Sequence, residues 1–152
     1  IYHSPLDVQA EDNLHNYFMA LSTEPRQANA TIDIAHRAVQ FRREAEGIIW
    51  FEFSELCEKP RSQYDYMELS KIYHTLLMSN VKQMGQGNDD AARRFIALVD
   101  EFYERKVKLI ISAAVPMEQL YSGGILSFEF RRCLSRLQEM QSHDYLALAH
   151  LP

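Results

Sequence analysis

Arginine side chains provide the main candidate chemistry in this sequence, because a guanidinium presents a planar fork of donors that suits phosphate. Arg93 and Arg94 lie early in a predicted helix, where the helix dipole disfavours a cation by ~0.3–1 kcal/mol. Either a bound phosphate offsets this cost, or the i,i+4 pairs Asp89–Arg93 and Asp90–Arg94 do so at ~0.2–0.5 kcal/mol each. Both explanations stay open at this point. The candidate phosphate-binding residues are Arg93, Arg94, Arg132 and Arg136.

No motif of a self-contained enzyme accompanies these arginines. The five glycines, at positions 47, 85, 87, 123 and 124, form neither a phosphate loop ending in Lys-Ser/Thr nor a dinucleotide-binding fingerprint. Gly-x-Ser-x-Gly and His-Glu-x-x-His are also absent. The histidines are scattered singly and Cys57 lies far from Cys133, so the pattern predicts neither a metal site nor a disulfide scaffold.

The composition is that of an ordinary globular domain. The chain has 152 residues, of which 47% are hydrophobic, and this length suffices for one compact domain with a proper core. Its net charge of −5 leaves no electrostatic footprint for nucleic acid. The longest apolar runs are too short to span a membrane. We expect a single domain over residues 1–152, with a helix and linker (1–30), a β-rich hairpin segment (31–53) and an α/β unit (54–152).

Hydrophobic periodicity predicts the elements that position the arginines. Helical spacing predicts a helix over Asp7–Leu21, and alternation over Thr31–Phe53 predicts two or three strands with a hairpin. Strands and helices then alternate, which is typical of an α/β fold with a parallel-rich sheet flanked by helices. Strands are predicted at Ile48–Phe53, Tyr73–Ser79, Val107–Ser112 and Ser127–Phe130, and helices at Asp65–Ile72, Asn88–Arg105, Pro116–Tyr121 and Arg131–Gln141.

This topology would bring the arginines to one edge of the sheet, because ligands of open parallel sheets bind at the carboxyl ends of the strands. The strand Tyr73–Ser79 leads to Arg93 and Arg94, and the strand Ser127–Phe130 leads to Arg131, Arg132 and Arg136. We expect the guanidinium groups of Arg93, Arg94, Arg132 and Arg136 to form a positive patch. The alternative is that nearby carboxylates neutralise them, namely Asp89, Asp90 and Glu139.

Six tracts of the sequence resemble a known family. They are Phe51–Cys57, Asp65–Tyr66, Asp90–Tyr103, Val107–Ala113, Phe128–Phe130 and Ser135–Ser142, and they are similar to the C-terminal half of the ZapE-type cell-division ATPases. The mitochondrial lactation-elevated proteins share the same pattern. The resemblance covers nearly the whole chain. The family patterns Arg-Arg-Phe-Ile and Phe-x-Arg-x-x-Ser-Arg-Leu match Arg93, Arg94, Arg132 and Arg136, whereas Arg131 stands outside them.

The resemblance implies a larger AAA+ ATPase of which this chain is a C-terminal fragment. In such proteins the phosphate loop and the acidic metal-binding motif lie N-terminal to the matching region. ATP and Mg²⁺ would then be bound by the full-length protein and not by this fragment alone. The α/β unit would be a degenerate phosphate-loop-NTPase-like core whose arginines complete the nucleotide site or the interface of a homo-oligomer.

The resemblance also implies partners and a location. The partners would be the N-terminal ATPase domain of the same protein and FtsZ or another division-ring protein, with no nucleic acid. The location would be cytoplasmic, at the inner face of the membrane at the division site, with peripheral membrane association. The alternative is a partner-binding module without a nucleotide role, which recruits FtsZ or a membrane protein. Its candidate surfaces are the opening helix, with Leu14, Tyr17 and Phe18, and the hairpin at Ala35–Arg37.

Overall fold

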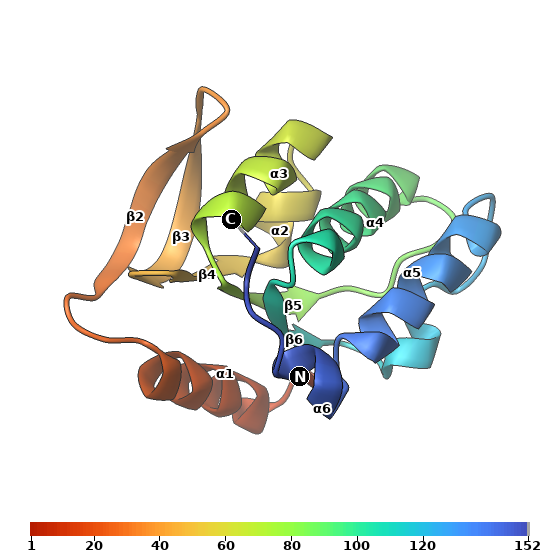
Figure 1. Ribbon diagram of the computed structural model, residues 1–152. Coiled ribbons are helices and arrows are strands. Elements are labelled where there is room, and N and C mark those ends of the chain that lie inside the picture. Colours follow the sequence, from red (N-terminus) through yellow and green to blue (C-terminus); the bar gives the residue numbers. More distant parts are fainter. Residues whose placement is uncertain (152) are drawn as a thin grey trace.

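A six-stranded mixed sheet forms the centre of the molecule (Figure 1). The structure is a computed structural model and describes residues 1–151. The strand order is β1-β6-β5-β4-β3-β2. Strands β4, β5, β6 and β1 run parallel, whereas β2, β3 and β4 form an antiparallel meander. The strands are β1 (Tyr2–His3), β2 (Gln27–Ile34), β3 (Arg37–Ala45), β4 (Ile48–Glu52), β5 (Thr75–Val81) and β6 (Lys108–Ala113).

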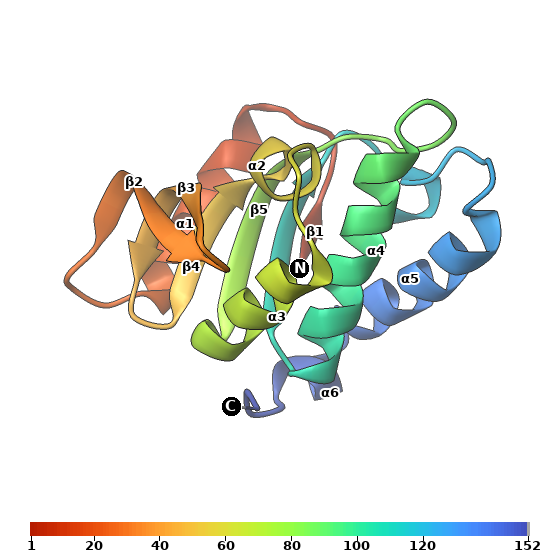
Figure 2. The ribbon, with the colours of Figure 1, turned by 90° about the horizontal axis from the view of Figure 1, so that it is seen from above.

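Helices cover both faces of this sheet, so the α/β prediction is confirmed. Helices α2 (Phe53–Cys57), α3 (Gln63–Ile72) and α4 (Asp89–Glu104) lie on one face, and α1 (Val8–Leu21) lies on the other (Figures 1 and 2). After β6 the chain forms the 3-10 turn η1 (Met117–Gln119), then α5 (Ser127–Glu139) beside α4, and finally α6 (His143–Leu146). Within residues 1–151 no helix has the length and hydropathy that crossing a membrane requires.

The helix starts follow from local capping. The Asp7 carboxylate accepts a hydrogen bond from the Ala10 amide at 2.9 Å, which satisfies a free donor of the first turn of α1. Ser62 and Asp65 form a capping box at the start of α3. Helix α4 begins with two acidic residues, Asp89 and Asp90, which suit the positive end of the helix dipole.

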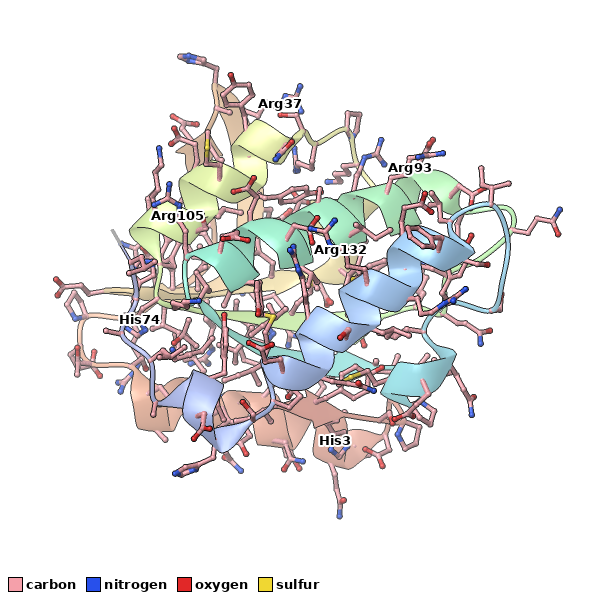
Figure 3. All side chains as sticks on the ribbon, turned by 45° about the vertical axis from the view of Figure 1, so that its right-hand side comes forward. His3, Arg37, His74, Arg93, Arg105 and Arg132 are labelled. Atoms are coloured by element: carbon pink, nitrogen blue, oxygen red, sulfur yellow. The ribbon has the colours of Figure 1, made fainter. Side chains whose placement is uncertain are left out.

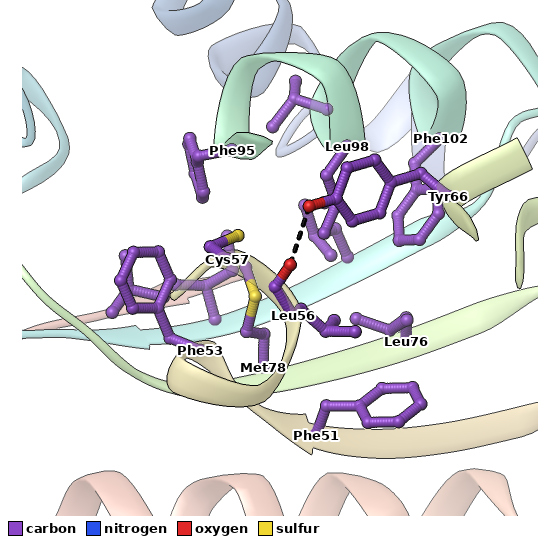
Figure 4. Close-up of a cluster of buried hydrophobic side chains, with 14 of the residues drawn as sticks. Phe51, Phe53, Leu56, Cys57, Tyr66, Leu76, Met78, Phe95, Leu98 and Phe102 are labelled. Carbon is purple, nitrogen blue, oxygen red and sulfur yellow. Dashed lines mark hydrogen bonds between the residues drawn. The ribbon is translucent and has the colours of Figure 1, made fainter. Parts of the chain in front are cut away.

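Two hydrophobic cores lie on the two faces of the sheet. The larger core lies under α2–α5 and contains a cluster of aromatic side chains (Figure 4). In it the Tyr66 hydroxyl donates to the Leu56 carbonyl at 2.6 Å, so this buried polar group is satisfied. The smaller core lies under α1 and contains Leu14, Phe18, Ala45, Ile48, Trp50, Leu77 and Ile110.

One predicted strand is wrong. Residues Ser127–Phe130 form the first turn of α5, because the alternation of Phe128 and Phe130 belongs to a helix that buries Phe130, Cys133 and Leu137 at helical spacing. Residues two apart lie on nearly opposite sides of a helix, so Phe128 is exposed while Phe130 is buried.

Three short elements were not predicted. The edge strand β1 has only two residues, α2 begins at Phe53, where the predicted strand Ile48–Phe53 was expected to end, and α6 follows the last predicted helix. The segment 31–53 does contain antiparallel strands, but the first of them already begins at Gln27. The remaining predicted strands and helices are present, with ends that differ by a few residues.

Candidate functional site

The predicted patch of four arginines does not form, because two of the four are held inside the fold. The Arg94 side chain donates to the Cys57 carbonyl at 3.2 Å, which ties α4 to the end of α2. The Arg136 guanidinium pairs with Asp100 at 2.6 Å and lies 5.0 Å from the ring centre of Tyr103. These contacts link α4 to α2 and α5 to α4, the helices that cover the larger core.

The error in the strand prediction explains why Arg132 and Arg136 are displaced from the predicted edge. Because Ser127–Phe130 is helical, both arginines follow a helical turn and not the carboxyl end of a strand. They lie in the second and third turns of α5, beside α4. The Arg136–Glu139 pair considered as an alternative does not form either, since Glu139 accepts the Tyr103 hydroxyl at 2.7 Å.

Arg93 and Arg132 lie on the outer face of α4 and α5 (Figure 3). Both side chains are exposed, and neither has an ion pair or hydrogen bond within residues 1–151. The expected pairs of Asp89 with Arg93 and of Asp90 with Arg94 are likewise missing from the described part of the chain. A shallow groove of about 250 Å³ runs beside Arg93, lined also by Gln63, Ile96, Ala97, Asp100, Leu126 and Glu129.

The carboxyl edge of the sheet holds a second polar cluster that sequence analysis missed. Arg42 of β3 makes a two-pronged ion pair with Glu11 of α1, at 2.9 and 2.6 Å, and lies 4.2 Å above the Trp50 ring. The hydrogen bonds from Arg42 lower the pKa of the Glu11 carboxyl. Ser79 accepts hydrogen bonds from both Arg42 and the Trp50 indole, at 3.0 and 2.7 Å. No spacing rule links these residues, which come from four separate elements.

The remaining feature of this edge is a hollow of about 440 Å³ at the start of α4. Three of its seven lining residues are acidic, and the lining comprises Glu58, Gly87, Asn88, Asp89, Asp90, Ala91 and Arg94. The glycine loop with Lys-Ser/Thr that holds nucleotide phosphates is missing from the sequence. Residues 1–151 also contain no group of three or more His, Cys, Asp or Glu side chains placed to hold a metal ion. This edge therefore offers no phosphate loop for ATP.

Comparison with known proteins supports the family resemblance that the sequence tracts indicate. The family model described as AFG1-like ATPase matches residues 1–149. This chain belongs to the AFG1-like ATPase family. The cell division protein ZapE of Escherichia coli strain K12 is 45% identical over 148 residues, covering 97% of this chain and 40% of ZapE. The resemblance to ZapE-type proteins is thereby confirmed.

A more distant relative extends the family to vertebrates. Lactation elevated protein 1 homolog B of Danio rerio is 28% identical over 183 residues, covering 95% of this chain and 36% of that protein. This AFG1-like chain thus spans about two fifths of the length of the curated relatives it matches. No solved structure matches it.

Proposed function

We propose that this chain works as the C-terminal part of a ZapE-type ATPase in cell division and does not hydrolyse ATP alone. Two findings support this: membership of the AFG1-like ATPase family, and a sequence that lacks the phosphate loop. ATP and Mg²⁺ are bound by a part of the protein outside this chain. The protein works in the cytoplasm at the inner face of the membrane, with FtsZ or another division-ring protein as partner.

The free guanidinium groups of Arg93 and Arg132 carry the more specific proposal. Both face away from the core on α4 and α5 without a carboxylate partner in the described residues, unlike Arg136. They contact the nucleotide-binding part of the same protein or of a neighbouring copy in a homo-oligomer. An arginine supplied to a transferring phosphate accelerates related reactions by roughly 10³–10⁵.

ATP hydrolysis by the full-length protein tests this role. Arg93→Ala and Arg132→Ala should each lower kcat at least tenfold, whereas Lys71→Ala, which removes an exposed cation elsewhere, should leave it unchanged. The isolated 152-residue chain should show no turnover with ATP and Mg²⁺. Full activity in both arginine variants, or turnover by the isolated chain, would contradict the proposal.

A second candidate function is partner binding. Leu14 and Phe18 are buried, so they cannot contact a partner, but Tyr17, Met19 and Leu21 of the same helix are 37–50% exposed. At the hairpin tip His36 and Arg37 are exposed, and Arg37 donates to the Pro60 carbonyl at 2.6 Å and pairs with Asp65 at 3.4 Å. Exposed apolar side chains also lie at the start of α5.

Charge reversal separates the two candidate functions. If Arg93→Glu in the full-length protein abolishes ATP hydrolysis and keeps partner binding, the nucleotide role is supported. Loss of partner binding with normal hydrolysis supports the second function.

A further inference from the structure

The start of α5 carries a surface that the core does not use. Ile125 is 73% exposed and Phe128 is 76% exposed, although Leu126 and Phe130 between and beside them are buried. Arg131 and Arg132 lie one helical turn after Phe128, at i+3 and i+4, so their side chains flank the same outward side of the helix. We call Ile125, Phe128, Arg131 and Arg132 the α5 ridge.

The charges of the α5 ridge are unpaired, in contrast to arginines elsewhere in the fold. Arg93, Arg131 and Arg132 contact no carboxylate, carbonyl or ring within residues 1–151. Each of the other arginines has a partner in the fold, for example Arg42 with Glu11, Arg61 with Glu55 and Arg136 with Asp100. Arg131 and Arg132 therefore leave two unpaired guanidinium groups on the α5 ridge of a chain whose net charge is −5.

We infer that the α5 ridge binds an acidic peptide segment that carries a large apolar side chain. This inference rests on the second candidate function above and names its surface and the chemistry of its partner. Phe128 and Ile125 bury against the apolar side chain of the segment, which removes exposed apolar area from water. Carboxylates on either side of it accept the paired donors of Arg131 and Arg132. Charge complementarity thus selects an acidic partner.

The same residues argue against other occupants. Ile125 has no ring on which a base could stack. Two apolar side chains are also few for insertion into a lipid surface, since interfacial binding scales with the apolar area buried.

Selection from a displayed library of 12-residue peptides tests the inference. The 152-residue chain is the immobilised target, and no nucleotide is present. One library carries a fixed Leu-Phe pair between randomised acidic flanks, and its matched control carries basic flanks. We expect enrichment from the acidic library alone. By fluorescence anisotropy, the best peptide should bind at least tenfold more weakly to Phe128→Ser. It should bind at least fivefold more weakly to Arg131→Ala/Arg132→Ala, and its affinity should fall as salt rises.

Two controls keep the result interpretable. Phe128 is exposed, so Phe128→Ser should keep the wild-type circular dichroism spectrum, and Lys71→Ala should bind the peptide normally. No enrichment from the acidic library, or binding that Phe128→Ser leaves intact, overturns the inference. Self-association of the chain, or binding of single-stranded DNA or of anionic vesicles, that disappears in Phe128→Ser also overturns it. Because this assay contains no ATP, its failure leaves the arginine role in hydrolysis to be judged by kcat alone.

Discussion

Replacing Phe95 by alanine should remove a large part of the stability of this fold. The Phe95 side chain is fully buried, with its ring centre 6.3 Å from that of Phe53 and stacked 5.9 Å from that of Phe130. Full burial of a phenylalanine contributes ~1.5–3 kcal/mol, and each aromatic pair adds ~0.5–1.5 kcal/mol. We therefore expect a loss of ~3–5 kcal/mol, as is usual for Phe→Ala in cores, out of a typical total of ~5–15 kcal/mol.

Urea unfolding measures this loss directly. With a slope of ~2 kcal/mol/M, within the range for small proteins, the midpoint should fall by about 1.5–2.5 M. Phe128→Ala is the matched control, because this side chain of the neighbouring helix is 76% exposed; its midpoint should correspond to a change within ~0.5 kcal/mol. If Phe95→Ala stays within ~1 kcal/mol of wild type, or the control costs as much, the assignment of buried and exposed faces to α4 and α5 is wrong.

Three further predictions concern charge and titration. A double-mutant cycle on Arg136 and Asp100, which pair at 2.6 Å and are partly exposed, should give a coupling of ~0.2–1 kcal/mol; zero coupling would mean that the pair is not formed in solution. Burial, with smaller contributions from a nearby histidine and lysine, lowers the pKa of His74. The unfolded chain therefore binds the proton first, so the contribution of His74 to the free energy of unfolding should be constant well above pH ~6.5 and fall as the pH drops below ~6.5; His74→Gln should flatten this slope, and an unchanged slope would refute its origin. Burial also raises the pKa of the Cys57 and Cys133 thiols, so both should react with a thiol reagent only as fast as the chain unfolds, and rapid labelling of the native chain would contradict their burial.

The long amphipathic elements could be predicted from the sequence, because burial of one face imposes a regular spacing. Helix α4 shows this most clearly: Ala92, Phe95, Val99 and Phe102 recur at helical spacing in the sequence, and all four are buried. Strands β5 and β6 are nearly continuous apolar runs, as buried parallel strands require.

The first turn of α5 could not be predicted in the same way, because Phe128 and Phe130 give the two-residue alternation of a strand. The burial of Phe130 together with Cys133 and Leu137 shows the helical period, and that period is visible only over a longer window. For the candidate site, the sequence predicted that arginines are the candidate residues and where their helices begin. It could not predict that Arg94 would donate to the Cys57 carbonyl and Arg136 to the Asp100 carboxylate, because those contacts link segments about 36 residues apart.

The single tryptophan of the chain lies in the smaller core, and this gives the molecule a built-in optical probe. Trp50 is stacked under Arg42 and its ring centre is 6.2 Å from that of Phe18 of α1. Its emission therefore reports whether α1 is docked on the sheet, while Tyr66 and Tyr145 give near-ultraviolet signals from the opposite face. Where the two signals change at the same urea concentration, both faces of the sheet unfold as one cooperative unit. Where the tryptophan signal changes first, α1 is a separate and weaker layer that can open while the arginine-bearing helices stay folded.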